Sequence, residues 1–171
     1  MALSAALTVR AAGPGDAGAI AALHNPFIRD TIVTFTDRER SAPEVAALIE
    51  GGQRHWLAEL AGRPVGFATF FQFRKGPGYA RTFEHTVLLA PEGRGQGGGR
   101  ALLGAVEAGA RAAGGHSLFA GVSAENAAGV AFHAAAGFRE VARLPEVGWK
   151  FGRYHDLVLM QKVLSPGAGG A

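Results

Sequence analysis

One glycine-rich stretch, residues 94–103 (RGQGGGRALL), constrains the fold and chemistry of this chain more than any other feature. Glycines let the backbone turn sharply, direct several N–H groups toward one point and allow a ligand to approach closely. The apolar residues that follow recur at helical spacing, and the N-terminus of a helix carries a partial positive charge. The sequence therefore predicts a phosphate or pyrophosphate site where a loop becomes a helix.

Three phosphate-binding patterns compete for these residues. A P-loop requires Lys-Ser or Lys-Thr directly after its glycines, and neither pair follows here. The dinucleotide pattern Gly-x-Gly-x-x-Gly is matched by Gly93, Gly95 and Gly98. However, residues 116–118 (HSL) stand where an acidic residue should hold the ribose. The P-loop is excluded, and a nicotinamide-dependent oxidoreductase is kept as an alternative.

The third pattern, Arg/Gln-x-x-Gly-x-Gly/Ala between a strand and a helix, is met by Arg94, Gly97 and Gly99. This segment resembles the pyrophosphate-binding loop of the GNAT acetyltransferases, a family of enzymes that bind acetyl-coenzyme A. Gln96 begins a second match to the same pattern, with Gly99 and Ala101. We expect Arg94 to set the register.

The resemblance to this family extends on both sides of the loop. Residues 79–91 resemble the strand that carries the family's catalytic carboxylate and ends at the coenzyme. Asn126, followed by Phe132-His133 and Gly137-Phe138, resembles the family's second signature, a helix with Asn at its start and Gly-Phe after its end. The resemblance implies a GNAT-type α/β fold and acetyl-coenzyme A as cosubstrate.

Two further segments are similar to one branch of the family. Residues 25–35 resemble the early substrate loop, and residues 149–160 the closing hairpin, of the phosphinothricin and methionine-sulfoximine acetyltransferases. The matches together cover residues 8–163. We expect residues 1–7 to be an N-terminal extension, residues 8–163 one acetyltransferase domain and residues 164–171 (LSPGAGGA) a disordered tail.

Composition agrees with a single enzyme domain. The chain has 171 residues, is 48% hydrophobic and contains no cysteine, which excludes disulfides, thiolate metal sites and a cysteine acyl-enzyme. Its net charge is +3, but its 17 Lys and Arg residues are scattered, so we expect no nucleic-acid partner. There is no apolar run long enough for a membrane span and no basic residue before the apolar start, so a cytoplasmic protein without a bound metal is expected.

Turn and cap signals divide the chain into alternating elements. A Ser41-Ala42-Pro43-Glu44 capping box starts one helix, and Asn25-Pro26 is expected to stop an earlier one. The predicted strands cover residues 7–11, 55–60, 65–73, 83–89, 117–122 and the region after Gly137. The predicted helices cover residues 17–23, 41–51, the segment from the glycine loop to Gly114, and 126–136. This pattern predicts an α/β fold, with a mixed, mostly antiparallel sheet, one right-handed β-α-β crossover and flanking helices.

Glu84 is the candidate catalytic base. Amide formation from a thioester needs a neutral amine, a polarised carbonyl and a proton for the leaving thiolate. Glu84 interrupts an apolar strand a few residues before the glycine loop, where packing alone does not favour a carboxylate. The alternative is a structural ion pair with Arg74, Lys75 or Arg81.

Two histidines are candidates for the proton at sulfur. Many GNAT relatives have Tyr seven positions after the Asn, whereas this chain has His133, as the phosphinothricin-type branch does. Histidine can protonate a thiolate or hydrogen-bond its sulfur. The alternative is a packing role for His133. His85, next to the base, is the second candidate, with a structural hydrogen bond as its alternative.

The coenzyme is expected to contact three segments. Backbone N–H groups near Val87 are expected to bind the thioester carbonyl and the pantetheine, where the strand separates from its neighbour. Asn126 is expected to contact the coenzyme as well as cap a helix. The predicted coenzyme-binding residues are Val87, Leu88, Leu89, Arg94, Gly95, Gln96, Gly97, Gly98, Gly99, Arg100 and Asn126.

The acceptor is expected to be a small amino-acid-like amine. Cationic and aromatic side chains suit a carboxylate with a phosphinyl or sulfonyl oxygen. The predicted substrate residues are Phe27, Phe35, Arg74, Lys75, Tyr79, Arg81 and Tyr154. Core packing remains the alternative for the two phenylalanines, and a polyamine, a protein amino terminus or a lysine remain alternative acceptors.

Two points beyond the acceptor stay open. A coenzyme-binding module without catalysis is the alternative to an enzyme, although Glu84 and His133 argue against it. We expect a homodimer, because dimers are common among the relatives. The apolar strand of residues 157–160 (LVLM) either pairs across the dimer or lies in the core.

Overall fold

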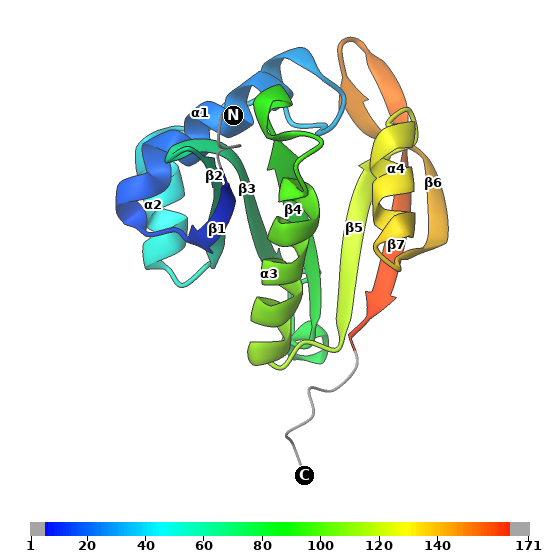
Figure 1. Ribbon diagram of the computed structural model, residues 1–171. Coiled ribbons are helices and arrows are strands. Elements are labelled where there is room, and N and C mark those ends of the chain that lie inside the picture. Colours follow the sequence, from blue (N-terminus) through cyan, green and yellow to red (C-terminus); the bar gives the residue numbers. More distant parts are fainter. Residues whose placement is uncertain (1–5, 165–171) are drawn as a thin grey trace.

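The computed structural model describes residues 6–164, and it folds them around one seven-stranded sheet of order β1-β2-β3-β4-β5-β7-β6 (Figure 1). The strands are β1 (Leu7–Ala11), β2 (His55–Leu60), β3 (Arg63–Gln72), β4 (Thr82–Leu89), β5 (Ser117–Ser123), β6 (Arg139–Lys150) and β7 (Arg153–Val163). The helices are α1 (Ala17–Asp30), α2 (Ala42–Glu50), α3 (Gly98–Ala112) and α4 (Ala127–Ala135), with short 3-10 turns η1 (Pro14–Asp16), η2 (Pro77–Tyr79) and η3 (Pro91–Gly93). The predicted α/β class and mostly antiparallel sheet are confirmed.

The expected N-terminal extension (residues 1–7) and the expected tail (residues 164–171) lie almost wholly outside the described residues. Leu7, at the end of the expected extension, already opens β1. Leu164, at the start of the expected tail, is only 1% exposed and packs in the core.

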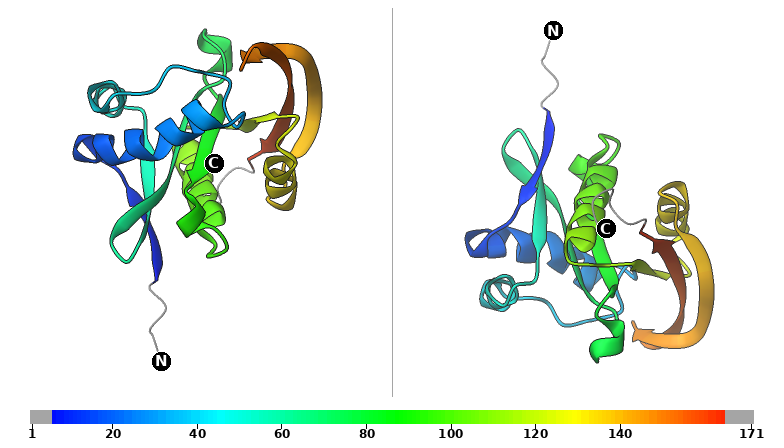
Figure 2. Two further views of the ribbon diagram at one scale, coloured as in Figure 1. Left: turned by 90° about the horizontal axis from the view of Figure 1, so that it is seen from above. Right: turned by 90° about the horizontal axis from the view of Figure 1, so that it is seen from below.

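One parallel pair divides the sheet into two antiparallel halves. Strands β1 to β4 pair antiparallel in sequence order, and β5, β7 and β6 pair antiparallel on the other side. Only β4 and β5 run parallel, and α3 connects them as the expected crossover. Figure 2 shows the two halves on opposite sides of β4 and α3. β7 lies between β5 and β6, so residues 157–160 belong to an interior strand.

The sheet is covered on both faces, as the alternation of its strands requires. Ala58 and Ala68 point into a core shared with α3 and α4, whereas their neighbours Leu57 and Phe67 point into a second core with α1 and α2. Because both faces are packed, the middle of β3 is continuously buried from Val65 to Phe70.

The first helix is longer than the sequence predicts. Asn25-Pro26 was expected to end it, but α1 continues through Pro26 to Asp30. Ile28, which follows the proline, is fully buried, and the Asn25 side chain exchanges two hydrogen bonds with the backbone of Arg40. Burial and this link to a distant segment stabilise a helical turn that local propensity disfavours.

The other helix starts follow their cap residues. Ser41 and Glu44 form the predicted capping box of α2. The Asn126 side chain accepts a hydrogen bond of 2.9 Å from the N–H of Gly129 at the start of α4. Gly97, with a φ of +78°, is the N-cap of α3. Each cap fixes where a helix points relative to the sheet.

The two central parallel strands separate partway along their length. β4 pairs with β5 only from Thr82 to His85, opposite Ser117 to Ala120. Beyond that point β4 continues to Leu89 along β3, and β5 continues to Ser123 along β7. The predicted separation of the strand near Val87 is confirmed, and the resulting opening positions the site.

Candidate active site

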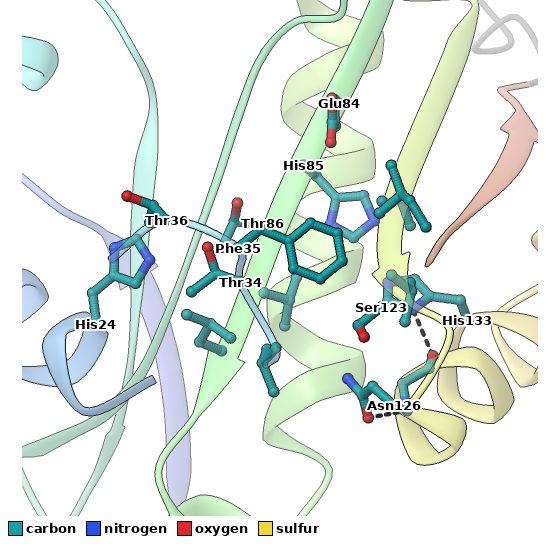
Figure 3. A pocket seen from close by; sticks show the side chains of 18 of the residues that line it. His24, Thr34, Phe35, Thr36, Glu84, His85, Thr86, Ser123, Asn126 and His133 are labelled. Atoms are coloured by element: carbon teal, nitrogen blue, oxygen red, sulfur yellow. Dashed lines mark hydrogen bonds between the residues drawn. The ribbon is translucent and has the colours of Figure 1, made fainter. Parts of the chain in front are cut away.

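A cavity of about 530 Å³ occupies the opening between β4 and β5. Its walls come from both strands, from α4 and from the loop that follows α1 (Figure 3). Its lining residues are His24, Val33, Thr34, Phe35, Thr36, Arg40, Phe71, Glu84, His85, Thr86, Val87, Leu88, Ala120, Gly121, Val122, Ser123, Asn126, Gly129, Phe132, His133 and Leu157. The three candidate catalytic residues are therefore brought together in one cavity.

Glu84 lies where β4 and β5 are still paired and reaches across to β5. A Cβ added to Gly121 would lie 2.9 Å from the Glu84 Oε1 atom, so the carboxylate lies directly over the bare backbone of β5. Burial raises the pKa of Glu84. Among residues 6–164 no ion pair includes Glu84, so the alternative role of pairing with Arg74, Lys75 or Arg81 finds no support.

His85 and His133 form a buried pair beside Glu84. Their ring centroids are 5.1 Å apart, and Phe138 packs edge-on against both rings. Burial, with a smaller contribution from His133, lowers the pKa of His85 to about 3, and burial also lowers the pKa of His133. Both rings are therefore neutral at physiological pH.

One hydrogen bond defines the tautomer of His133. Its Nδ1 atom lies 2.7 Å from the carbonyl oxygen of Gly129, which can only accept, so the proton resides on Nδ1. The Nε2 atom is then an acceptor. Within the described chain, His133 Nε2 and both ring nitrogens of His85 are buried without a hydrogen-bond partner. Orphaned polar atoms at a cavity wall favour a ligand that supplies their partner.

The glycine loop has the geometry of an anion cradle. Gly95 and Gly97 have φ values of +74° and +78°, and added Cβ atoms there would meet nothing within 4 Å, so both face open space. The first helical hydrogen bond of α3 runs from Ala101 N–H to the Gly97 carbonyl. The N–H groups of residues 98–100 therefore precede the hydrogen-bonded ladder and can bind an anion.

The other glycines of the loop serve packing. Added Cβ atoms at Gly98 and Gly99 would lie 2.9 Å from Leu7 and 3.2 Å from Leu89 and Phe132, respectively. These two glycines let α3 approach the sheet closely. Gln96 donates a hydrogen bond of 3.2 Å to the Glu92 carbonyl and thus fastens the loop to η3.

The remaining predicted coenzyme residues connect the cavity to the loop. Val87 and Leu88 line the cavity, and Leu89 packs beneath the glycines. Asn126 also lines the cavity (Figure 3), and because its Oδ1 atom caps α4, its Nδ2 group is left as a donor. β4 therefore connects the cavity at Glu84 with the glycine loop through Leu89.

The predicted substrate residues are divided by the structure. Phe35 lines the cavity. Phe27 packs at the edge of the α1–α2 core, and Tyr154 is 58% exposed on β7. Arg74, Lys75, Tyr79 and Arg81 lie around η2 between β3 and β4, outside the cavity lining, with the Arg74 guanidinium 5.6 Å from the Tyr79 ring centroid. The substrate roles of these six residues stay predictions.

Several cavity residues escaped the sequence analysis. His24, Thr36, Arg40, Phe71, Gly121 and Ser123 all contribute to the lining. Gly121 carried a usable signal, because a glycine inside a buried strand marks a close approach. His24, whose pKa burial lowers to about 4, sits on α1 and carried none.

The described residues contain neither a metal-binding cluster nor a membrane-spanning helix. In residues 6–164 no three His, Asp or Glu side chains are placed to hold a metal ion. No helix within that part of the chain is long and apolar enough to span a membrane.

Residues 20–138 match the model of the acetyltransferase (GNAT) family. An L-methionine sulfoximine/L-methionine sulfone acetyltransferase of Salmonella typhimurium is 35% identical over 159 residues, which are 91% of this chain and 93% of that protein. A phosphinothricin N-acetyltransferase of Alcaligenes faecalis is 36% identical over 169 residues, 95% of this chain and 85% of that protein.

Solved structures agree with these sequence matches. A Salmonella typhimurium protein solved with its cofactor acetyl-CoA superposes with a TM-score of 0.88 at 34% identity, covering 97% of this chain and 98% of that one. A phosphinothricin acetyltransferase from Sinorhizobium meliloti in complex with acetyl-CoA gives a TM-score of 0.86 at 26% identity, covering 99% and 93%.

Proposed function

Because the chain belongs to the acetyltransferase (GNAT) family and is an acetyl-coenzyme A-dependent N-acetyltransferase, we propose that its acceptor is the amine of a small amino acid of the methionine-sulfone or phosphinothricin type. The relatives named for such acceptors match almost the whole chain. The observation that carries the proposal is the half-buried Glu84 carboxylate in the cavity lining, which has no ion-pair partner among residues 6–164.

The glycine loop and the opened strand fit the coenzyme. Arg94 and Arg100 add two cationic side chains to the glycine loop. The free N–H groups at the start of α3 add the partial positive charge of a helix N-terminus, which favours a pyrophosphate there. Beyond His85 the edge of β4 facing β5 is unpaired, so its N–H groups there can bind the pantetheine amides and the thioester carbonyl. The bound coenzyme supplies an activated acetyl group.

Glu84 acts as the base. An alkyl-ammonium must lose a proton before its nitrogen can attack a carbonyl, and a raised pKa brings a carboxyl group closer to the working pH. The proton passes from the amine to Glu84, directly or through one water molecule. Gly121 leaves room for the carboxylate over β5, which keeps it inside the cavity.

When the tetrahedral intermediate collapses, the surplus proton of the attacking nitrogen passes to the leaving thiolate, and the resulting thiol lies beside His133. The Nε2 atom of His133 is an acceptor in the resting site, so it can accept a hydrogen bond from a thiol but must take up a proton before it can donate one. His85 packs against His133, whose Nε2 atom is itself buried. We therefore propose that His133 accepts a hydrogen bond from the thiol of the coenzyme and that His85 positions the His133 ring.

Arg40 makes the cavity suitable for an amino-acid carboxylate. This residue is the one arginine or lysine among the lining residues of the cavity. A guanidinium binds carboxylates and sulfonyl oxygens through paired N–H groups. A polyamine would instead require additional acidic groups, and Glu84 is the one carboxylate among the lining residues of this cavity.

A thiol-release assay over a panel of amines tests the acceptor. The panel contains L-methionine sulfone, L-methionine sulfoximine and phosphinothricin, together with spermidine and a lysine peptide. We expect kcat/KM to be highest, by about 100-fold or more, for the three amino-acid analogues. Turnover of spermidine or the peptide alone would contradict the proposed acceptor while leaving acetyl transfer intact.

The transfer is direct, within a ternary complex. The chain has no cysteine, and the cavity provides no Ser or Thr hydroxyl paired with a base among its hydrogen bonds in residues 6–164. Intersecting initial-rate patterns are expected when both substrates are varied. Parallel patterns would show an acetyl-enzyme and contradict this order of events.

We also propose a homodimer and a cytoplasmic location. Trp149, Phe151 and Tyr154 are 57–58% exposed on the β6–β7 hairpin, beside Val147, and together form an apolar surface that a second copy would cover. The cytoplasmic location is supported by the absence of cysteine and by the supply of acetyl-coenzyme A there.

A further inference from the structure

The acceptor side of the cavity is a loop that lacks regular structure. Residues 31–36 leave α1 and provide Val33, Thr34, Phe35 and Thr36 to the lining. Within the loop, Thr31 Oγ1 donates a 2.8 Å hydrogen bond to the Phe27 carbonyl and accepts one from Val33 N–H. A wall built from such a loop needs support from elsewhere if it is to define a substrate.

Lys150, at the end of β6, supplies part of that support. Its side chain is buried, with 2% exposure, and its Nζ atom donates hydrogen bonds of 2.6 and 2.7 Å to the carbonyl oxygens of Thr31 and Thr34. A buried ammonium that binds the carbonyls of Thr31 and Thr34 holds the loop at its start and near its middle.

Phe35 rests directly on the same hairpin. A Cβ atom at Gly148 would overlap the Phe35 ring, with its nearest ring atom at 2.3 Å, so only glycine permits this contact. The ring also stacks on His155, with centroids 5.6 Å apart and an interplanar angle of 21°. Phe35 thus contacts the hairpin and also lines the cavity, where Figure 3 shows its ring among the lining side chains.

His155 is itself fixed by two acceptors. Its Nδ1 atom lies 2.8 Å from Glu125 Oε2 and its Nε2 atom lies 2.9 Å from the Lys150 carbonyl. These two contacts fix the orientation of the buried ring. The ring pairs with Glu125, next to the Asn126 cap, and presents its face to Phe35.

We propose that Gly148, Lys150 and His155 are positioning residues that hold Phe35 against the cavity, so that the β6–β7 hairpin determines how long an acceptor side chain the enzyme accepts. This inference rests on the proposed amino-acid acceptor. The acceptor amine enters past Glu84, and its side chain extends toward Phe35.

Selectivity between two acceptors of different length tests the position of Phe35. The measured quantity is the ratio of kcat/KM for L-ethionine sulfone to that for L-methionine sulfone, which differ by one methylene. Gly148→Ala drives the ring into the cavity and should lower the ratio roughly tenfold. Phe35→Ala widens the cavity and should raise the ratio. Gly104→Ala, on the open face of α3, is the matched control.

The double variant Gly148→Ala/Phe35→Ala makes the test specific. Without the ring there is nothing for the new methyl group to displace, so the double variant should behave like Phe35→Ala. The proposal would be overturned if both single variants changed the ratio of kcat/KM values in the same direction. It would also be overturned if their effects on this ratio were additive in the double variant.

Amide hydrogen exchange tests the clamp without any acceptor. Lys150→Met should speed exchange in residues 31–36 by about tenfold or more while leaving the affinity for acetyl-coenzyme A unchanged. Lys162→Met is the matched control, because Lys162 also donates to a backbone carbonyl, that of Ala136, away from the loop. Unchanged exchange in Lys150→Met overturns the clamp. If exchange rises but no amino acid is acetylated, the clamp stands and the proposed acceptor fails.

Discussion

At the scale of single residues, Glu84 gives the sharpest kinetic prediction. Glu84→Gln should lower kcat roughly 100-fold near neutral pH, because the amine arrives protonated and loses its base. The loss should shrink at high pH, where the amine is already neutral, and the affinity for acetyl-coenzyme A should not change. Glu50→Gln, exposed at the end of α2, is the control. A pH-independent loss would point to a structural role instead.

The same carboxylate predicts an opposite effect on stability. Because burial raises the pKa of Glu84 in the folded state, ionisation disfavours folding. The free energy of unfolding should fall as pH rises from the unfolded pKa through the raised folded one. Glu84→Gln should therefore unfold at a higher temperature than the wild type at neutral pH, as measured by calorimetry. A lower Tm would contradict the burial of an unpaired charge.

The sequence predicted which candidate side chains meet in the cavity, but it did not predict their protonation and tautomeric states. A lone carboxylate in an apolar strand was enough to single out Glu84, and seven-residue spacing from Asn126 was enough for His133. The tautomer of His133 depends on the Gly129 carbonyl one helical turn away and on burial by Phe138. Such facts follow only from the packed structure.

At the scale of elements, the glycine loop gives a test with a matched control. Gly97→Val should weaken acetyl-coenzyme A binding at least tenfold in isothermal titration, because the side chain enters the open space of the cradle. Gly62 has a similar φ of +73° and equally open surroundings, but lies in the β2–β3 turn. Gly62→Val should therefore cost comparable stability and leave binding intact. Equal binding losses would mean that backbone strain, not the cradle, is responsible.

Cap and turn residues in the sequence predicted most helices and strands, but they did not predict contacts between segments that are far apart in the chain. The capping box of α2 and the Asn126 cap of α4 were recoverable, because their partners lie within one turn. The continuation of α1 past Pro26 was not, since it depends on Asn25 binding the backbone of Arg40. The contact of Lys150 with Thr31 spans most of the chain and leaves no pattern in the sequence.

At the scale of the whole molecule, the exposed hairpin predicts the assembly. Trp149→Glu should convert the proposed homodimer to a monomer in light scattering, because it places a charge in the centre of an apolar surface. Leu48→Glu, at a comparable apolar position on α2, should have no effect. A wild-type chain that is already monomeric at micromolar concentration would contradict the dimer.

The division of the sheet links the whole fold to its chemistry. β4 delivers Glu84 and the coenzyme-facing backbone, α3 presents the cradle, and the β5–β7–β6 half delivers His133 by way of α4 and supports Phe35. The parallel strands β4 and β5 are joined through α3 and not by a hairpin, so they can separate partway along their length without breaking one. The cavity therefore follows from the topology itself.

A crystal structure with coenzyme A and L-methionine sulfone would test the central claim most directly. The account predicts the pyrophosphate at the backbone of residues 94–100, the pantetheine between β4 and β5, and the acceptor amine within one water molecule of the Glu84 carboxylate. The sulfone should point toward Phe35. An acceptor bound away from Glu84, or a coenzyme that bypasses the glycine loop, would contradict it.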